Sequence, residues 1–124
     1  MAKPIANVVG FDDAPFAYEH RGDIRLVGAV CARTRLDGVL SGTIRRDGVN
    51  ATATMTELVR GGRFRGHIRA VLLQGIAVGG FNVVDIHGLH EALNVPVKFL
   101  GVGEKATDLL AFDPAEFARE VLEG

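Results

Sequence analysis

The chain has 124 residues, of which 48% are hydrophobic and 23% charged, and its formal net charge is -1. This length fits one domain, and this composition excludes a largely disordered chain. No window approaches 18 unbroken apolar residues, which argues against a membrane span. The single cysteine, Cys31, excludes an internal disulfide and a multi-cysteine zinc site. With no long apolar stretch at the N-terminus, these features predict a cytoplasmic protein.

The first half of the chain predicts three strands. Residues 5–11 form a short apolar run that a turn at residues 12–15 stops. Residues 25–32 show little alternation, which predicts a strand buried on both faces. Residues 38–45 alternate more clearly, and the short link at residues 34–37 predicts a hairpin. These three strands are therefore expected to form an antiparallel meander.

Helices and strands alternate in the rest of the chain. A helix is predicted over residues 51–60, where Asn50 or Thr52 could cap the first turn and Gly61 and Gly62 end the helix. Strands follow at residues 68–73 and 95–100, with a helix between them at residues 82–93.

The last helix has the most complete local signature. Asp113 is the predicted N-cap, Pro114 takes the first helical position, and Glu116 completes a capping box. Phe112 is expected to pack on Phe117 as a hydrophobic staple. This helix is predicted to cover the last strand.

The order of these elements predicts one α/β domain over residues 1–124. Right-handed crossovers would place the later strands parallel to one another. The expected architecture has three layers and a mixed five-stranded sheet of the ribonuclease H-like type, with the first strand between the second and the fourth. A Rossmann-like doubly wound sheet is the alternative, because the second half has the same local pattern.

Charge is unevenly distributed along the chain. Residues 1–92 carry 11 basic and 9 acidic side chains, a net charge of +2, whereas residues 93–124 carry 3 basic and 6 acidic ones, a net charge of -3. Four arginines fall within ten residues: Arg60, Arg63, Arg65 and Arg69. They predict a nucleic-acid-binding patch that contacts phosphates. The alternative is a solvated helix end and loop, because the chain as a whole is not basic.

Five segments together carry a resemblance to a known family. They are residues 9–16 (Val-Gly-Phe-Asp-Asp-Ala-Pro-Phe), 36–40 (Leu-Asp-Gly-Val-Leu), 46–52 (Arg-Asp-Gly-Val-Asn-Ala-Thr), 73–77 (Leu-Gln-Gly-Ile-Ala) and 79–86 (Gly-Gly-Phe-Asn-Val-Val-Asp-Ile). Residues 1–93 thereby resemble the endonuclease dU family, also called domain of unknown function ninety-nine, a distant relative of endonuclease V. The resemblance implies a ribonuclease H-like fold and metal-dependent cleavage of DNA near deaminated bases.

Three carboxylates are the candidate catalytic and metal-binding residues. Asp12 and Asp13 end the first predicted strand and Asp47 ends the third. Carboxylates at neighbouring strand ends suit Mg²⁺, and the resemblance to endonuclease V implies that Asp47 is a second ligand. Because side chains alternate along a strand, only one of the Asp12–Asp13 pair is expected to point into the site. The alternative is that all three are turn and cap residues.

Two positions depart from the family pattern. Gln74 and Asn50 stand where many relatives carry Asp. A neutral amide is a weaker ligand than a carboxylate, so these departures argue against a complete two-metal site.

The tail carries a second resemblance. Residues 96–105, 108–109 and 112–114, with Phe117, resemble the C-terminal end of signal-recognition-particle receptor GTPases. Because two families meet near Leu93, where the net charge also changes sign, we interpret the chain as a recombined or designed chimera without native catalysis. A natural fusion or a truncated homologue is the other origin, and a metal-dependent endonuclease is the alternative function. The chain contains no GxxxxGK[ST] motif, which argues against GTP binding.

Three further residues and one edge complete the candidates. His87 and His90 could share a helix face and bind a transition metal, although no third ligand is evident nearby. Cys31 lies in an apolar segment and is predicted to belong to the core. An uncovered sheet edge would allow a homodimer.

Overall fold

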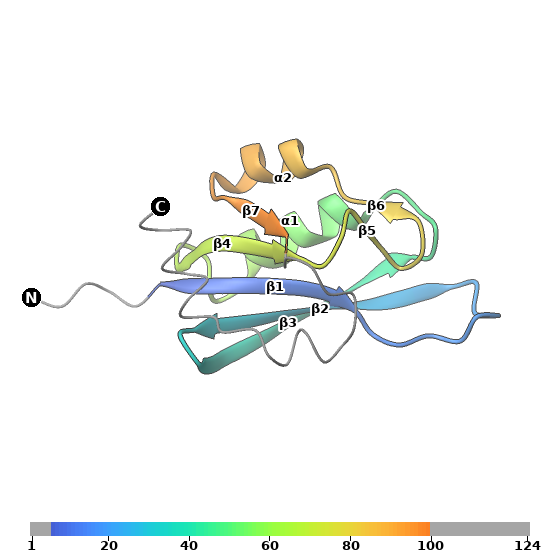
Figure 1. Cartoon of the computed structure of the whole chain (residues 1–124), viewed down its shortest axis with the longest axis horizontal. Coiled ribbons are helices and arrows are strands. Elements are labelled where there is room, and N and C mark those ends of the chain that lie inside the picture. Colours follow the sequence, from blue (N-terminus) through green and yellow to red (C-terminus); the bar gives the residue numbers. More distant parts are fainter. Residues whose placement is uncertain (1–5, 100–124) are drawn as a thin grey trace, which may run out of the picture.

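The structure, a computed structural model, describes residues 6–99; the predicted final helix and its staple lie outside the described residues. One five-stranded sheet runs in the order β3-β2-β1-β4-β7 (Figure 1). Its strands are β1 (Asn7–Asp13), β2 (Asp23–Ala32), β3 (Arg35–Arg45), β4 (Ile68–Leu73) and β7 (Val97–Phe99).

The sheet is mixed. β1 pairs antiparallel with β2, and β2 antiparallel with β3, whereas β4 lies parallel to both β1 and β7. The predicted mixed sheet with a central first strand is therefore confirmed, and the alternative of a doubly wound parallel sheet is wrong. Because β1 and β4 are adjacent and parallel, their carboxyl ends meet at one edge of the sheet.

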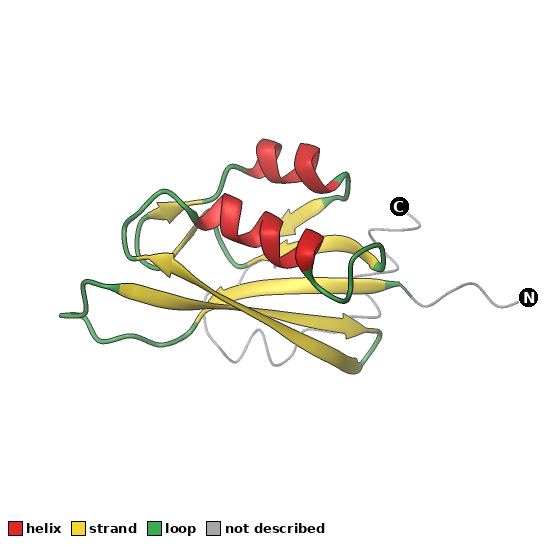
Figure 2. Cartoon of the chain, turned by 180° about the vertical axis from the view of Figure 1, so that it is seen from behind, coloured by secondary structure: helices red, strands yellow, loops and turns green. Residues whose placement is uncertain are grey.

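Two helices, α1 (Ala51–Gly61) and α2 (Ile86–Leu93), lie on the same face of the sheet (Figure 2). Met55 and Leu89 are fully buried and belong to one cluster with Phe11 and Leu73 of the sheet. The described residues thus form two layers, and the helix predicted to start after Asp113 lies outside them. Neither described helix is long and apolar enough to cross a membrane.

The early strands differ in detail from their predicted form. β2 alternates between buried and more exposed residues, so the prediction of burial on both faces is wrong. Cys31 is consequently half-buried rather than part of the core. β1 extends through Asp12 and Asp13, which were expected in a turn. The hairpin link is shorter than expected, because β3 begins at Arg35 and Arg33 adopts a positive φ of 58°.

The segment before α2 was wrongly assigned to that helix. It forms a small hairpin of β5 (Ala77–Val78) and β6 (Asn82–Val83), turned by two glycines, Gly79 and Gly80, with positive φ. The helix starts only at Ile86, after Asp85, whose carboxylate accepts a hydrogen bond of 3.0 Å from the Gly88 amide. This N-cap, rather than apolar periodicity, defines the start of α2.

The start of α1 also differs from expectation. Asn50 occupies the N-cap position but makes no side-chain cap bond. Thr52 does not cap either, since its hydroxyl accepts a hydrogen bond of 2.8 Å from the Asp85 amide. The Ala51 amide instead donates to the side chain of Asn82, a residue of β6. A distant part of the chain therefore completes the first turn of α1.

Candidate active site

A polar site lies at the edge of the sheet where β1 and β4 end. Asp12 and Asp13 are the last two residues of β1, and Gln74 directly follows β4. All three residues are half-buried. Crevices at the carboxyl ends of strands are common ligand sites in α/β sheets.

Asp12 and Gln74 contact each other directly. With its amide nitrogen toward Asp12, Gln74 donates to the two carboxylate oxygens at 3.1 and 3.3 Å. The Asp13 amide donates to Asp12 Oδ1 at 2.9 Å. Burial raises the pKa of Asp12 and the Asp13 charge raises it further, although the backbone hydrogen bond opposes this shift. A carboxyl group with a raised pKa in such a place is a candidate functional group.

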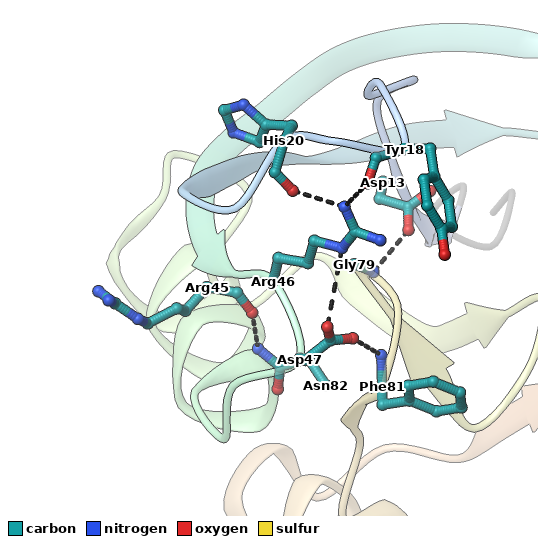
Figure 3. Close-up of polar contacts among 9 residues, drawn as sticks. All are labelled: Asp13, Tyr18, His20, Arg45, Arg46, Asp47, Gly79, Phe81 and Asn82. Carbon is teal, nitrogen blue, oxygen red and sulfur yellow. Dashed lines mark hydrogen bonds and ion pairs between the residues drawn. The ribbon is translucent and has the colours of Figure 1, made fainter.

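Asp13 is linked to Asp47 through Gly79. The Gly79 amide donates to Asp13 Oδ2 at 2.5 Å (Figure 3). The Gly79 carbonyl accepts from the Asp47 amide at 2.9 Å. One residue of the β5–β6 turn therefore connects the end of β1 with the turn between β3 and α1.

The Asp47 carboxylate supports the same turn. Its Oδ1 accepts a hydrogen bond of 2.8 Å from the Phe81 amide, and its Oδ2 lies 3.7 Å from Arg46 Nε. A Cβ added at Gly80 would lie 2.3 Å from Asp47 Oδ1, so the backbone approach requires glycine there. Asp47 thus positions the β5–β6 turn beside Asp13.

Arg46 anchors the β1–β2 loop to this assembly. Its guanidinium lies 5.1 Å from the Phe16 ring centre and 5.6 Å from that of Tyr18. It also donates to the carbonyl oxygens of Tyr18 and His20. Only 11% of its side chain is exposed. The sequence analysis missed Arg46, because nothing local distinguishes it from the neighbouring Arg45.

Asn82 is the second residue that the sequence analysis missed. It is fully buried and makes three hydrogen bonds: it accepts from the Ala51 amide and donates to the Arg45 carbonyl and to Asn50 Oδ1. Its segment was noted only as part of the family pattern. An Asn among apolar residues after a glycine pair was the available signal, since a buried amide needs several partners.

The three predicted carboxylates do not form one metal-binding group. Within residues 6–99, no three His, Cys, Asp or Glu side chains are grouped so that they could hold a metal ion. The oxygen-bearing side chains that do lie together are Asp12, Asp13 and Gln74, because the Asp12 carboxylate interacts with both of the others. The expectation that only one of the Asp12–Asp13 pair would point into the site is therefore wrong. Asp47 is committed to the Phe81 amide and neighbours Arg46.

The predicted arginine patch lies at the other end of the sheet. Arg60, Arg65 and Arg69 line a cavity near Ile68, which pairs with Asn7 at the start of β1. The fourth residue of the patch, Arg63, instead stacks over the Phe64 ring at 5.0 Å. The arginines and the carboxylates are therefore separate sites.

The remaining candidates have local contacts. His90 Nδ1 lies 2.8 Å from the Val95 carbonyl oxygen, and both His87 and His90 are exposed. Burial raises the pKa of the Cys31 thiol, and the Asp37 carboxylate raises it further.

Two aromatic rings are exposed beside the carboxylates. The exposed fraction is 79% for Tyr18 and 80% for Phe81. Tyr18 belongs to the loop that Arg46 anchors, and Phe81 to the turn that Asp47 supports (Figure 3).

Sequence comparisons place the chain among known relatives. A UPF0215 protein of Deinococcus radiodurans is 50% identical over 93 residues, which cover 75% of this chain and 47% of that protein. One from Methanothermobacter thermautotrophicus is 45% identical over 91 residues, covering 73% and 45%. One from Thermococcus gammatolerans is 39% identical over 117 residues, covering 91% and 58%. The chain spans about half the length of the first two relatives.

Two solved structures are similar in fold. A protein of unknown function from Archaeoglobus fulgidus matches with a TM-score of 0.69 and 28% identity, over 95% of this chain and 69% of that one. Endonuclease V from Ciona intestinalis, solved with a DNA containing an inosine, matches with a TM-score of 0.53 and 12% identity. That match covers 96% of this chain and 56% of that one. The fold is thus similar to that of endonuclease V.

The comparisons do not support a junction near Leu93. The model of the Endonuclease dU family matches residues 4–111, which extends well past the proposed junction. This match gives no support to a segment from a signal-recognition-particle GTPase, and β7 pairs in parallel with β4 as part of the sheet. The change of net charge along the chain therefore does not mark a change of family. The chain belongs to the Endonuclease dU family, UPF0215.

Proposed function

We propose that this domain is a metal-dependent nuclease that cleaves DNA near deaminated bases. The observation that carries the proposal is the group formed by Asp12, Asp13 and Gln74 at the carboxyl ends of two adjacent parallel strands. Membership of the Endonuclease dU family and the fold shared with a DNA-bound endonuclease V support the same activity.

The donor set of this group fits Mg²⁺. This ion commonly uses only one or two carboxylates, keeps several waters and takes further oxygen ligands from substrate phosphates. Asp12 and Asp13 supply two carboxylates, and Gln74 would supply its amide oxygen by a rotation that exchanges the amide nitrogen and oxygen. Bound there, Mg²⁺ would polarise a phosphate oxygen and stabilise charge in the transition state.

The other residues of the site would position the nucleic acid. Asp47 and Arg46 hold the turn that carries Phe81 and the loop that carries Tyr18. Stacking of an unpaired base on an aromatic side chain contributes about 1–3 kcal/mol. The two exposed rings would therefore bind bases next to the carboxylates.

A cleavage assay tests the catalytic part of this proposal. Labelled DNA duplexes containing deoxyuridine, deoxyinosine or only ordinary bases are incubated with the chain and Mg²⁺ or Mn²⁺. We expect nicking of the deaminated substrates that EDTA abolishes and that Asp12→Asn and Asp13→Asn reduce at least about 100-fold. Glu57→Gln, which changes an exposed carboxylate on α1, is the matched control. Equal nicking by all variants would contradict the proposal.

A binding assay tests the role of the rings. Loss of one stacking contact of about 1–3 kcal/mol corresponds to roughly a fivefold to hundredfold weaker affinity. We expect this loss for Tyr18→Ala and for Phe81→Ala with single-stranded DNA. Val49→Ala provides the control, because Val49 is 96% exposed and apolar but has no ring.

A DNA-binding domain without catalysis is the second candidate. The specific observation in its favour is Gln74, a neutral side chain in contact with Asp12 where a third carboxylate would strengthen metal binding. Saturable binding of deaminated DNA without nicking in either metal would favour this candidate.

A further inference from the structure

We propose that the cavity lined by Arg60, Arg65 and Arg69 binds a nucleoside phosphate. The cavity has a volume of about 430 Å³ and lies between the end of α1, the start of β4 and the α2–β7 connection. This volume falls within the usual range of about 300–1,000 Å³ for small-molecule sites. The inference goes beyond the nuclease activity proposed above, because it concerns a different site.

The deep part of the cavity is apolar. Val59 and Ile68 are buried, with 7% and 4% of their surface exposed, and Leu93 and Val95 are half-buried. These four side chains come from separate elements that the core already fixes. The apolar lining is therefore preformed, and it suits the flat face of a base better than it suits a free inorganic anion.

The outer part of the cavity is positively charged. All three arginines are exposed, and no Asp or Glu is among the residues that line the cavity. Among residues 6–99, ion pairs join only Arg35 to Asp37 and Arg46 to Asp47, so the three guanidinium groups have no acidic partner. Arg69 donates to the Gly66 carbonyl at 2.6 Å, which holds its side chain at the cavity.

Guanidinium groups around an apolar pocket select a particular ligand chemistry. Arginine binds phosphate oxygens through paired, charge-assisted hydrogen bonds. A nucleoside phosphate satisfies both parts of the site, with its base against the apolar lining and its phosphate among the arginines. A free nucleotide and the phosphorylated end of a nucleic acid share this chemistry.

The cavity cannot serve the same phosphate as the carboxylates. Ile68 starts β4 and Gln74 follows its end, and six residues of extended strand span about 20 Å. A ligand at the arginines would therefore occupy a second site at the opposite edge of the sheet. An effector or a distant part of a bound strand fits this position.

Titration calorimetry with adenosine monophosphate tests the proposal. We expect adenosine monophosphate to bind saturably and more tightly than adenosine or inorganic phosphate. We expect Arg60→Met and Arg65→Met each to weaken this affinity about tenfold or more. Arg63→Met is the matched control, because it removes the same charge from the same segment. The Arg63 guanidinium stacks on the Phe64 ring and does not line the cavity. We expect less than a twofold effect from Arg63→Met.

Two further measurements sharpen the result. The first measures the affinity for a DNA strand with a 5′-phosphate and for the same strand with a 5′-hydroxyl. If the phosphorylated strand binds more tightly than adenosine monophosphate, the ligand is the end of a strand. If adenosine monophosphate binds more tightly, the ligand is a free nucleotide. Asp13→Asn should leave the nucleotide affinity unchanged, so this result is independent of the nuclease test. The proposal is overturned if adenosine monophosphate does not bind saturably. It is also overturned if Arg63→Met weakens the affinity as much as Arg60→Met and Arg65→Met do, in variants that melt like the parent.

Discussion

The amide of Gly79 donates a hydrogen bond of 2.5 Å to the carboxylate of Asp13, which lies 66 residues earlier in the chain. Asp13 therefore has a structural contact as well as a proposed catalytic one. Asn at this position keeps an acceptor oxygen, whereas Ala removes the anchor of the β5–β6 turn. Activity tests at Asp13 are consequently informative with Asn, because Ala would change the loop at the same time.

Asp12→Asn should reduce nicking at least about 100-fold without loss of stability at neutral pH. Burial raises the pKa of Asp12, so the native state binds a proton more tightly than the unfolded chain. The contribution of Asp12 to the free energy of unfolding is therefore largest below the pKa of the unfolded chain, near 4. This contribution declines as the pH rises through the raised pKa of Asp12 in the native state. Asn carries no charge at any pH and lacks this decline.

Urea unfolding of the parent and of Asp12→Asn between pH 3 and pH 8 measures this effect. The difference between the two curves should shift in favour of the variant as the pH rises. A shift in favour of the parent would mean that ionised Asp12 stabilises the fold, which contradicts the direction of its pKa shift.

Gly80→Ala should destabilise the domain by more than a change of backbone preference alone. A residue forced into a strained backbone region costs about 1–3 kcal/mol, and the new Cβ would also lie 2.3 Å from Asp47 Oδ1. Gly66→Ala is the matched control, since Gly66 also has a positive φ but has nothing within 4 Å of an added Cβ. Equal free energies of unfolding for the two variants would argue against a tight contact at Asp47.

Asn82→Ala should be among the most destabilising polar substitutions. It would leave the Ala51 amide without its acceptor, and an unsatisfied buried group costs about 1–3 kcal/mol. The Arg45 carbonyl would still accept from the Gly48 amide, and Asn50 Oδ1 from the Arg45 amide. We expect a loss of at least about 1 kcal/mol in the free energy of unfolding, measured in urea. Asn94→Gly should change it little, because Asn94 has a left-handed conformation that glycine adopts readily.

Arg46→Met should release the β1–β2 loop without unfolding the domain. The variant loses the hydrogen bonds to the carbonyls of Tyr18 and His20 but keeps an apolar stem. Hydrogen exchange should accelerate over residues 14–22 and remain unchanged in β4. Arg45→Met is the control, because the described structure gives the Arg45 guanidinium no hydrogen bond or ion pair; a similar acceleration there would contradict this role of Arg46.

The sheet could be predicted from the sequence because local signals determine most of it. The apolar run of β4 was predicted with the bounds that the structure shows, and the short β2–β3 link implied the antiparallel pairing. The start of α2 could not be predicted from periodicity. It depends on Asp85 as N-cap and on Gly79 and Gly80, which turn the chain before the helix begins.

The candidate site could be predicted only in part, for a related reason. Asp12 and Asp13 stood out because acidic residues at the end of an apolar strand are visible in the sequence. Arg46 and Asn82 did not, since their roles arise from partners up to 37 residues away. The four arginines were grouped because they are close in sequence, but the side chain of Arg63 turns away from the cavity of the other three.

The dependence of α1 on Asn82 has a consequence for the order of folding. The first amide of α1 finds its acceptor 31 residues later in the chain, after β4 and the β5–β6 turn have been added. An isolated helix of this length is marginal in water. The N-terminal turn of α1 should therefore be frayed in the folding transition state and become ordered only when β6 docks, which would give low φ-values for substitutions at Ala51.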